Sequence, residues 1–229
     1  MKIRNIVLAV IIVLIAGFWG GGFMSSRSFE AAQKISLPEP VLDGEISVEQ
    51  AIAERRSIRH YRDEPLTIRE ISQVLWAASG ITDRVRHFRS VPSAGATYPL
   101  EVYLTSGRID GLEQGVFRYL PGDHALLRVM DQDQRNELYT QALRQSPVRN
   151  APAVMVIAGV FERTTKRYGQ RGQRYVYMEA GHAGQNIQLQ AHALGIGSVV
   201  IGAFDDAGVK DVLGLSRDVV PLYIVPLGR

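Results

Sequence analysis

The sequence predicts an α+β domain in which helices flank a mostly antiparallel central sheet, preceded by an N-terminal transmembrane or signal helix. Three observations lead to this class. Helical periodicities and apolar strand patterns follow one another as helices, strands, helix, strand, helix, strand, without the regular alternation of a doubly wound fold. The strand patterns include a hairpin, which favours antiparallel pairing. A long uncharged segment near the N-terminus predicts the leading helix.

The composition is that of an ordinary globular protein. Of the 229 residues, 46% are hydrophobic and 21% are charged, which suffices for one substantial core. The net charge is +3, and no basic patch marks a nucleic-acid surface, so nucleic acid is not an expected partner. Because the chain has no cysteine, it can form no disulfide, thiolate nucleophile or cysteine-ligated metal site. Redox chemistry would therefore need a bound cofactor.

Residues 1–26 have the pattern of a signal peptide or a membrane anchor. Lys2 and Arg4 precede an apolar run over residues 6–18, as in a signal peptide. The whole uncharged stretch around that run is also long enough to span a bilayer, and bulky residues where a peptidase needs small ones favour the uncleaved anchor. The leading positive charges predict a catalytic domain outside the cytoplasm, anchored to the membrane or exported to the periplasm.

The next residues predict a linker and then a folded domain. Residues 27–46 include two prolines and are expected to be a linker, and the domain is expected over residues 47–229. Ser47 with Gln50, and Thr67 with Glu70, have the spacing of capping boxes and open two helices. Further helices are expected over residues 131–144, 175–194 and 205–213. Strands are expected over residues 100–105, 115–119, 125–130, 153–161, 198–201 and 219–227.

Four segments are rich in groups that could hold an anionic, planar ligand. They are Arg-Arg-Ser-Ile-Arg at residues 55–59, Pro-Ser-Ala-Gly-Ala-Thr-Tyr-Pro at 92–99, Glu-Ala-Gly-His-Ala-Gly-Gln-Asn at 179–186, and Ile-Gly-Ala-Phe at 201–204. Guanidinium groups bind phosphate through charge-assisted hydrogen bonds, and small residues let a ligand approach the backbone. Each segment also has an ordinary structural alternative, such as solvated arginines at a helix end or a plain turn.

In this order, the four segments resemble the nitroreductase family, and most closely its SagB/ThcOx-type dehydrogenase branch. The resemblance covers residues 47–229 and includes Leu-Trp-Ala-Ala-Ser-Gly at residues 75–80. It implies a nitroreductase-like sandwich, FMN as the cofactor, and a homodimer with FMN in a cleft between the protomers.

The resemblance also assigns the cofactor-binding residues. Around the FMN phosphate, the ribityl chain and the N1–C2=O edge it places Arg55, Arg56, Ser57, Arg59 and Arg229. A fixed cation at that edge would stabilise the charge of reduced flavin. From the partner chain it places Ser93, Gly95 and Thr97, and at flavin N5 it places the turn at Gly202 and Ala203.

Glu179 and Tyr168 are the candidate catalytic residues. Glu179 lies three residues before His182 on one helix face, where both could serve in acid–base chemistry or make structural hydrogen bonds. Azole-forming enzymes of the SagB branch use a Lys-Tyr pair. Here the comparable stretch is Lys166-Arg167-Tyr168, and arginine cannot act as a neutral base, so that activity is not expected. The five histidines lack metal-ligand spacing, and no metal is expected.

Three functions follow from these residues. The first is an FMN-dependent oxidoreductase that transfers hydride through flavin N5 with an unidentified small-molecule substrate. An NAD(P)H-dependent nitro- or quinone-reductase is the alternative, although nicotinamides are scarce outside the cytoplasm. A flavin-binding module without turnover is the alternative from another class.

Overall fold

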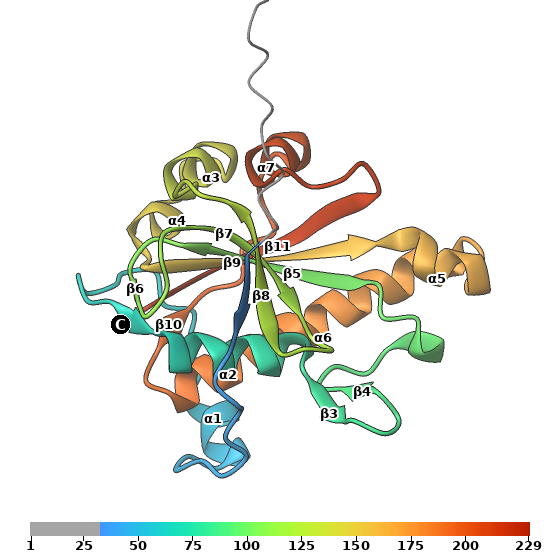
Figure 1. Ribbon diagram of the computed structural model, residues 1–229, viewed down its shortest axis with the longest axis horizontal. Coiled ribbons are helices and arrows are strands. Elements are labelled where there is room, and N and C mark those ends of the chain that lie inside the picture. The colour runs from blue at the N-terminus through green and yellow to red at the C-terminus, as the bar shows by residue number, and fades with distance from the viewer. Residues whose placement is uncertain (1–32) are drawn as a thin grey trace, which may run out of the picture. The chain divides into compact units, whose positions relative to one another are not determined.

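The computed structural model describes residues 33–229 (Figure 1). The segment expected to be a signal or anchor, residues 1–26, lies outside the described residues. Within residues 33–229, no helix is both long enough and apolar enough to cross a bilayer.

The centre of the domain is a seven-stranded sheet. Every neighbouring pair in it is antiparallel, which confirms the predicted α+β class with a mostly antiparallel sheet. In spatial order its strands are β1 (Lys34–Ser36), β8 (Ala125–Met130), β7 (Gly115–Leu120), β5 (Leu100–Ser106), β9 (Ala153–Val160), β11 (Val219–Gly228) and β10 (Gly197–Ser198). Two short pairs lie outside this sheet: β2 (Leu66–Thr67) with β6 (Ile109–Asp110), and β3 (Ile81–Asp83) with β4 (Phe88–Arg89).

Helices cover both faces of the sheet (Figure 1). On one face lie α2 (Ile68–Ser79) and α6 (Arg171–Ala193), with α1 (Val48–Glu54) packed on α6. On the other face lie α3 (Arg135–Gln141), α4 (Ser146–Asn150) and α7 (Asp206–Leu213). The remaining helices are α5 (Phe161–Tyr168), which follows β9, and the 3₁₀ turn η1 (Ala94–Ala96).

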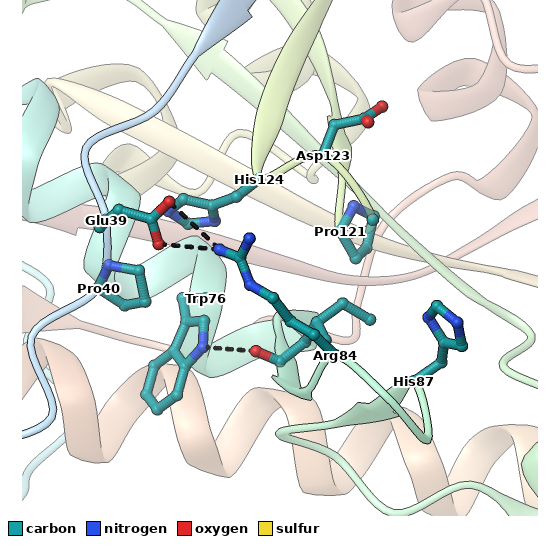
Figure 2. Close-up of a pocket in the computed structure, with 10 residues that line it drawn as sticks. Glu39, Pro40, Trp76, Arg84, His87, Pro121, Asp123 and His124 are labelled. Atoms are coloured by element: carbon teal, nitrogen blue, oxygen red, sulfur yellow. Dashed lines mark hydrogen bonds and ion pairs between the residues drawn. The ribbon is translucent and has the colours of Figure 1, made fainter.

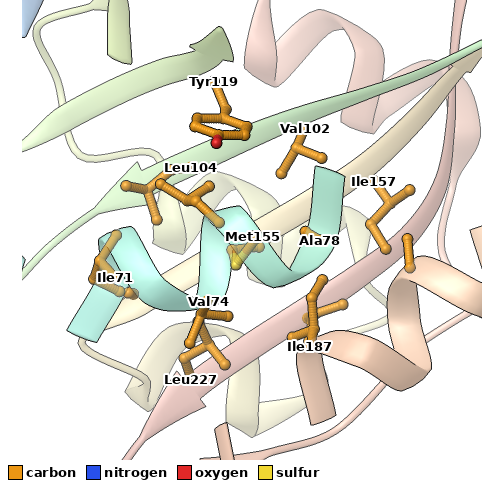
Figure 3. Close-up of a cluster of buried hydrophobic side chains, with 14 of the residues drawn as sticks. Ile71, Val74, Ala78, Val102, Leu104, Tyr119, Met155, Ile157, Ile187 and Leu227 are labelled. Atoms are coloured by element: carbon orange, nitrogen blue, oxygen red, sulfur yellow. The ribbon is translucent and has the colours of Figure 1, made fainter. Parts of the chain in front are cut away.

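The two faces carry separate apolar cores. Figure 3 shows the larger core, where α2 and α6 place their apolar faces against β5, β7, β9 and β11. Ile71, Val74 and Ala78 of α2 recur at helical spacing, which is why this helix lies flat on the sheet. Each fully buried side chain of the size of Ile187 contributes roughly 1.5–3 kcal/mol relative to its exposed state.

The segment expected to be a linker, residues 27–46, includes a folded part. Lys34–Ser36 form edge strand β1 on β8, and Leu37 is buried. Val41 is fixed to α2, since its N–H donates to Gln73 Oε1 at 2.8 Å and its oxygen accepts from Gln73 Nε2 at 2.9 Å. A three-residue strand is too short to show a period-two pattern, and its partner lies about ninety residues away in the sequence.

Other elements differ from the expected boundaries. The helix expected over residues 131–144 is shorter: only α3 forms within that range, and the chain leaves the helical conformation at Leu143 and Arg144, whose φ angles are 54° and 56°. Helix α4, which begins at Ser146, was not expected. The strand expected over residues 198–201 is shorter: β10 ends at Ser198, and Ile201 makes only an isolated bridge to Ile224. Helix α5 was not expected, since Thr164 is its only fully buried residue and it has no apolar stripe.

Candidate functional site

The first group of predicted site residues lies at one end of the sheet. We name Arg55–Arg59 together with Arg229 the arginine cluster. Ser57 forms a parallel bridge with Ser198, and the Ile58 N–H donates to the Ser198 oxygen at 2.9 Å. Gly197 makes this approach possible, because a Cβ there would lie 2.8 Å from the Ile58 side chain. The arginine cluster is therefore fixed to the sheet by its backbone.

Two of the four arginines of this cluster have partners within the described residues, and two do not. Arg56 caps α1, donating from Nη1 to the Ala53 oxygen at 2.9 Å and to the Arg55 oxygen at 2.8 Å. Arg229 pairs with Glu70, the residue that completes the capping box of α2. Among residues 33–229, Arg55 and Arg59 have no ion pair and no side-chain hydrogen bond. Two guanidinium groups of the cluster thus remain able to bind an anion.

The second group is built around the loop before β5. We name Ser93–Thr97, with Tyr168 and Glu179, the loop cluster. Gly95 has φ 59°, and Ala96 and Tyr98 also have positive φ, 53° and 44°. Such left-handed backbone costs an L residue roughly 1–2 kcal/mol. Side-chain bonds hold it: Ser93 Oγ accepts the Tyr98 N–H at 2.9 Å, and the Thr97 hydroxyl lies 2.8 Å from that of Thr164.

Glu179 reaches this loop from inside α6. Its side chain is buried, with 4% of the residue exposed, and its Oε1 accepts the Ala94 N–H at 2.9 Å. Burial raises the pKa of Glu179, while the hydrogen bonds from Ala94 and Ser93 act in the opposite direction. The Glu179 carboxyl therefore holds the loop, and it retains its proton to a higher pH than an exposed glutamate.

Tyr168 reaches the same loop from the end of α5. A Cβ built on Gly95 would lie 2.6 Å from the Tyr168 hydroxyl oxygen, so the hydroxyl lies directly against this glycine. Arg167 also contacts the loop, since its Nη1 donates to the Gly95 oxygen at 3.2 Å. Lys166 instead forms an exposed ion pair with Glu162 at 3.2 Å.

The two clusters lie at opposite ends of the sheet. The loop cluster precedes Leu100, which pairs with Gly159 of β9, whereas Arg229 follows Leu227, which pairs with Ala153. The distance from Ala153 to Gly159 along a strand is about 20 Å at 3.3 Å per residue. Helix α6 gives a similar separation between the two clusters. Glu179 of this helix contacts the loop, whereas His192 lies 3.5 Å from Glu54, the residue before Arg55. The thirteen residues between Glu179 and His192 correspond to about 20 Å along the helix.

The turn at Gly202 and Ala203 lies between these ends. Ile201 exchanges two backbone hydrogen bonds with Ile224 in the middle of β11. Gly202 is exposed, and the Ala203 oxygen accepts from Gln145 Nε2 at 2.9 Å. The turn is therefore held in place by its neighbours while its surface stays accessible.

Four pockets within residues 33–229 are lined by residues outside the two clusters and the turn. Figure 2 shows a polar pocket of about 210 Å³ between the segment at Glu39, the end of α2, the β3–β4 hairpin and the β7–β8 turn. His124 in its wall contacts the Tyr119 hydroxyl at 2.8 Å through Nδ1 and the Pro38 oxygen at 2.9 Å through Nε2. The sequence did not single out this histidine, since its partners come from distant segments.

Comparisons with known proteins show to which family this chain is related. Residues 52–229 match the Nitroreductase family. A protein of Methanocaldococcus jannaschii named "Putative nitroreductase" is 46% identical over 185 residues, which are 81% of this chain and 92% of that protein. The microcin B17-processing protein McbC of Escherichia coli is 31% identical over 165 residues, 69% of this chain and 61% of McbC.

A solved structure extends the likeness to the fold. The crystal structure of another protein named as a nitroreductase, from Anabaena variabilis, superposes with a TM-score of 0.77 at 32% identity. The match covers 88% of this chain and 42% of that one. The chain thus belongs to the nitroreductase family, whose members are in general flavin-dependent oxidoreductases.

Proposed function

We propose that this protein is an FMN-dependent oxidoreductase that acts as a homodimer, with each FMN held by residues of both protomers. The observation that carries this proposal is the placement of two ligand-competent clusters at opposite ends of one sheet. A partner protomer would bring its loop cluster to the arginine cluster of the first chain. Family members are typically dimeric and bind small-molecule substrates, which supports this arrangement.

The residues of the arginine cluster fit the phosphate of FMN. Arg55 and Arg59 have no anionic partner among residues 33–229, and Ser57 is exposed beside them. A phosphate would give Arg55 and Ser57 charge-assisted hydrogen bonds, and Arg59 would supply a cation near the flavin ring. When bound, FMN would supply a hydride acceptor at N5, and Gly202 leaves the backbone of its turn open to a flat ring.

The loop cluster would control protons at the reacting centre. A buried carboxyl with a raised pKa keeps its proton to a higher pH than an exposed one, so Glu179 could donate a proton as well as fix the loop. Tyr168 presents a hydroxyl beside Gly95 of the loop, since a Cβ built there would lie 2.6 Å from the hydroxyl oxygen. We propose these two residues as the acid–base pair of the reaction.

Within the family, the similarity to McbC favours the SagB-type branch for this chain. The structure of this chain, however, argues against azole formation. Lys166 and Tyr168 are two positions apart on α5 and so lie on different sides of the helix, with Lys166 paired to Glu162. A small-molecule dehydrogenase is therefore the proposed activity. The names of the M. jannaschii and A. variabilis relatives favour the second candidate, a nitro- or quinone-reductase using NAD(P)H.

We also propose that the catalytic domain lies outside the cytoplasm, anchored or exported by residues 1–26. This rests on the charge and apolar pattern of that segment. An outward-facing domain would meet membrane quinols more readily than nicotinamides.

The full chain, purified with FMN, tests these proposals. A bound flavin spectrum near one FMN per chain supports the cofactor, and anaerobic reduction by NADH or NADPH separates the reductase from the dehydrogenase. Arg55→Ala should weaken FMN binding by about 1.5–3 kcal/mol, the contribution of a hydrogen bond to a charged group. Arg84→Ala, an exposed arginine on the β3–β4 loop, is the matched control.

Two results would change the assignment. Equal FMN affinity in Arg55→Ala and Arg84→Ala would refute the phosphate placement. FMN that binds but is reduced by no donor other than dithionite would favour the flavin-binding module without turnover.

A further inference from the structure

A second set of arginines surrounds a pocket that the proposed flavin site does not use. The pocket has a volume of about 190 Å³ and lies beside β5 and β7. The charged residues lining it are Arg89 of β4, Arg118 of β7, Arg163 of α5 and Glu101 of β5. We name it the β5–β7 pocket. Its wall thus holds three guanidinium groups and one carboxylate.

The single carboxylate is already shared among several donors. Glu101 Oε1 accepts from Arg163 Nη2 at 2.6 Å, and Oε2 accepts from the Tyr103 hydroxyl at 2.9 Å. Arg118 Nη1 lies 3.7 Å from the same carboxylate, beyond hydrogen-bond distance. One negative charge therefore faces three positive charges, and the pocket keeps an excess of positive charge.

Arg89 is the least compensated of the three. Its Nη1 donates to Ser79 Oγ at 3.2 Å, and its guanidinium stacks on the Tyr98 ring at 4.5 Å from the centroid. Its Nε is buried and has no hydrogen-bond partner among residues 33–229. Burial lowers the pKa of Arg89, and the charge of Arg163 adds to this effect. A half-buried cation whose buried Nε has no acceptor is costly unless an anion accompanies it.

We propose that the β5–β7 pocket binds a small oxyanion, a phosphate or carboxylate group, between Arg89, Arg118 and Arg163. Guanidinium forks match the geometry of both groups. The volume of about 190 Å³ is several times the roughly 30 Å³ share of one water, but smaller than the roughly 300 Å³ at which pockets for whole ligands begin. The pocket therefore fits a free oxyanion or the charged end of a larger molecule.

The site is coupled to the loop cluster without depending on flavin. Arg89 stacks on Tyr98, and Arg163 Nη1 donates to the Tyr98 oxygen at 3.3 Å. An anion that holds both arginines would hold Tyr98 and, through it, the loop of Ser93–Thr97. Binding can be measured on the flavin-free protein, so it succeeds or fails separately from the proposed function.

Thermal unfolding of the full chain with sodium phosphate or sodium succinate, at constant ionic strength, tests the proposal. A ligand that binds only the folded state raises the melting temperature in a saturable way. We expect Arg118→Gln to weaken the tighter-binding anion about tenfold or more, as for the loss of one hydrogen bond to a charged group. Arg84→Gln, which removes an equal charge from an exposed side chain, should bind like the natural protein.

A second variant distinguishes an effect on anion binding from an effect of misfolding. Glu101→Gln keeps one of the two acceptor oxygens and removes the competing charge, so it should bind the anion more tightly, a gain that misfolding cannot produce. A preference for phosphate or for succinate identifies the group, and either one supports the site. The proposal is overturned if neither anion gives a saturable shift, or if Arg118→Gln and Arg84→Gln bind equally well.

Discussion

The substitution Gly95→Ala tests the geometry of the loop cluster most directly. Gly95 has φ 59° and ψ 23°, and an alanine in this left-handed conformation costs roughly 1–2 kcal/mol. The reduced freedom of the unfolded chain returns roughly 0.4–1 kcal/mol. The new Cβ would also lie 2.6 Å from the Tyr168 hydroxyl and 2.9 Å from Arg167 Nε, so both side chains must move. We expect a net loss of about 1–2 kcal/mol in the free energy of unfolding.

Urea unfolding followed by circular dichroism measures this loss. Gly122→Ala is the matched control, because no atom lies within 4 Å of the added Cβ and Gly122 is not among the glycines with positive φ. It should be neutral or gain up to about 1 kcal/mol. Ala96→Gly should gain stability, since it removes a left-handed alanine at φ 53°. Equal stability of Gly95→Ala and Gly122→Ala would show that the loop does not have this geometry or does not touch Tyr168.

Three further substitutions test the rest of the site and the core. Because burial raises the pKa of Glu179, its ionisation destabilises the fold as pH rises from the unfolded-state pKa through the folded-state pKa. In urea unfolding at a series of pH values, Glu179→Gln should therefore gain stability relative to the natural protein as pH rises above the unfolded-state pKa, and a pH-independent difference would contradict the raised pKa. Tyr168→Phe should lower turnover roughly 10²-fold if its hydroxyl transfers a proton, with FMN affinity unchanged in a titration, whereas unaltered turnover would leave the hydroxyl a packing role. Ile187→Ala, in the larger core, should cost about 2–5 kcal/mol in urea unfolding, and a loss below about 1 kcal/mol would mean that α6 is not packed there as described.

Local signals in the sequence were sufficient for much of the fold. Thr67 and Glu70 predicted a capping box that the structure shows with both of its hydrogen bonds. The apolar run at residues 153–161 corresponds to β9, whose eight residues are all buried. In both cases the cause lies within a few residues of its effect, so a single segment carries the whole signal.

Features that depend on distant partners could not be read from the sequence. Strand β1 needs β8 for its pairing, and α5 follows β9 without an apolar stripe of its own. The contact between Tyr168 and Gly95 joins residues more than seventy positions apart. The resemblance supplied both residues as separate candidates, and only the folded chain brings them together.

Arginines gather at two locations in the part of the chain that the structure describes. Arg55 and Arg59, which have no ion pair there, lie at one end of the sheet, and the three arginines of the β5–β7 pocket, which face a single carboxylate, lie near the other. The loop cluster lies beside the second location, because Arg89 and Arg163 both contact Tyr98. If two protomers meet as proposed, one loop would be bounded by the flavin phosphate site of its partner on one side and by its own oxyanion pocket on the other. The conformation of the loop would then depend on the binding of both the cofactor and a second anion. An anionic substrate could therefore be aligned with the flavin through this loop.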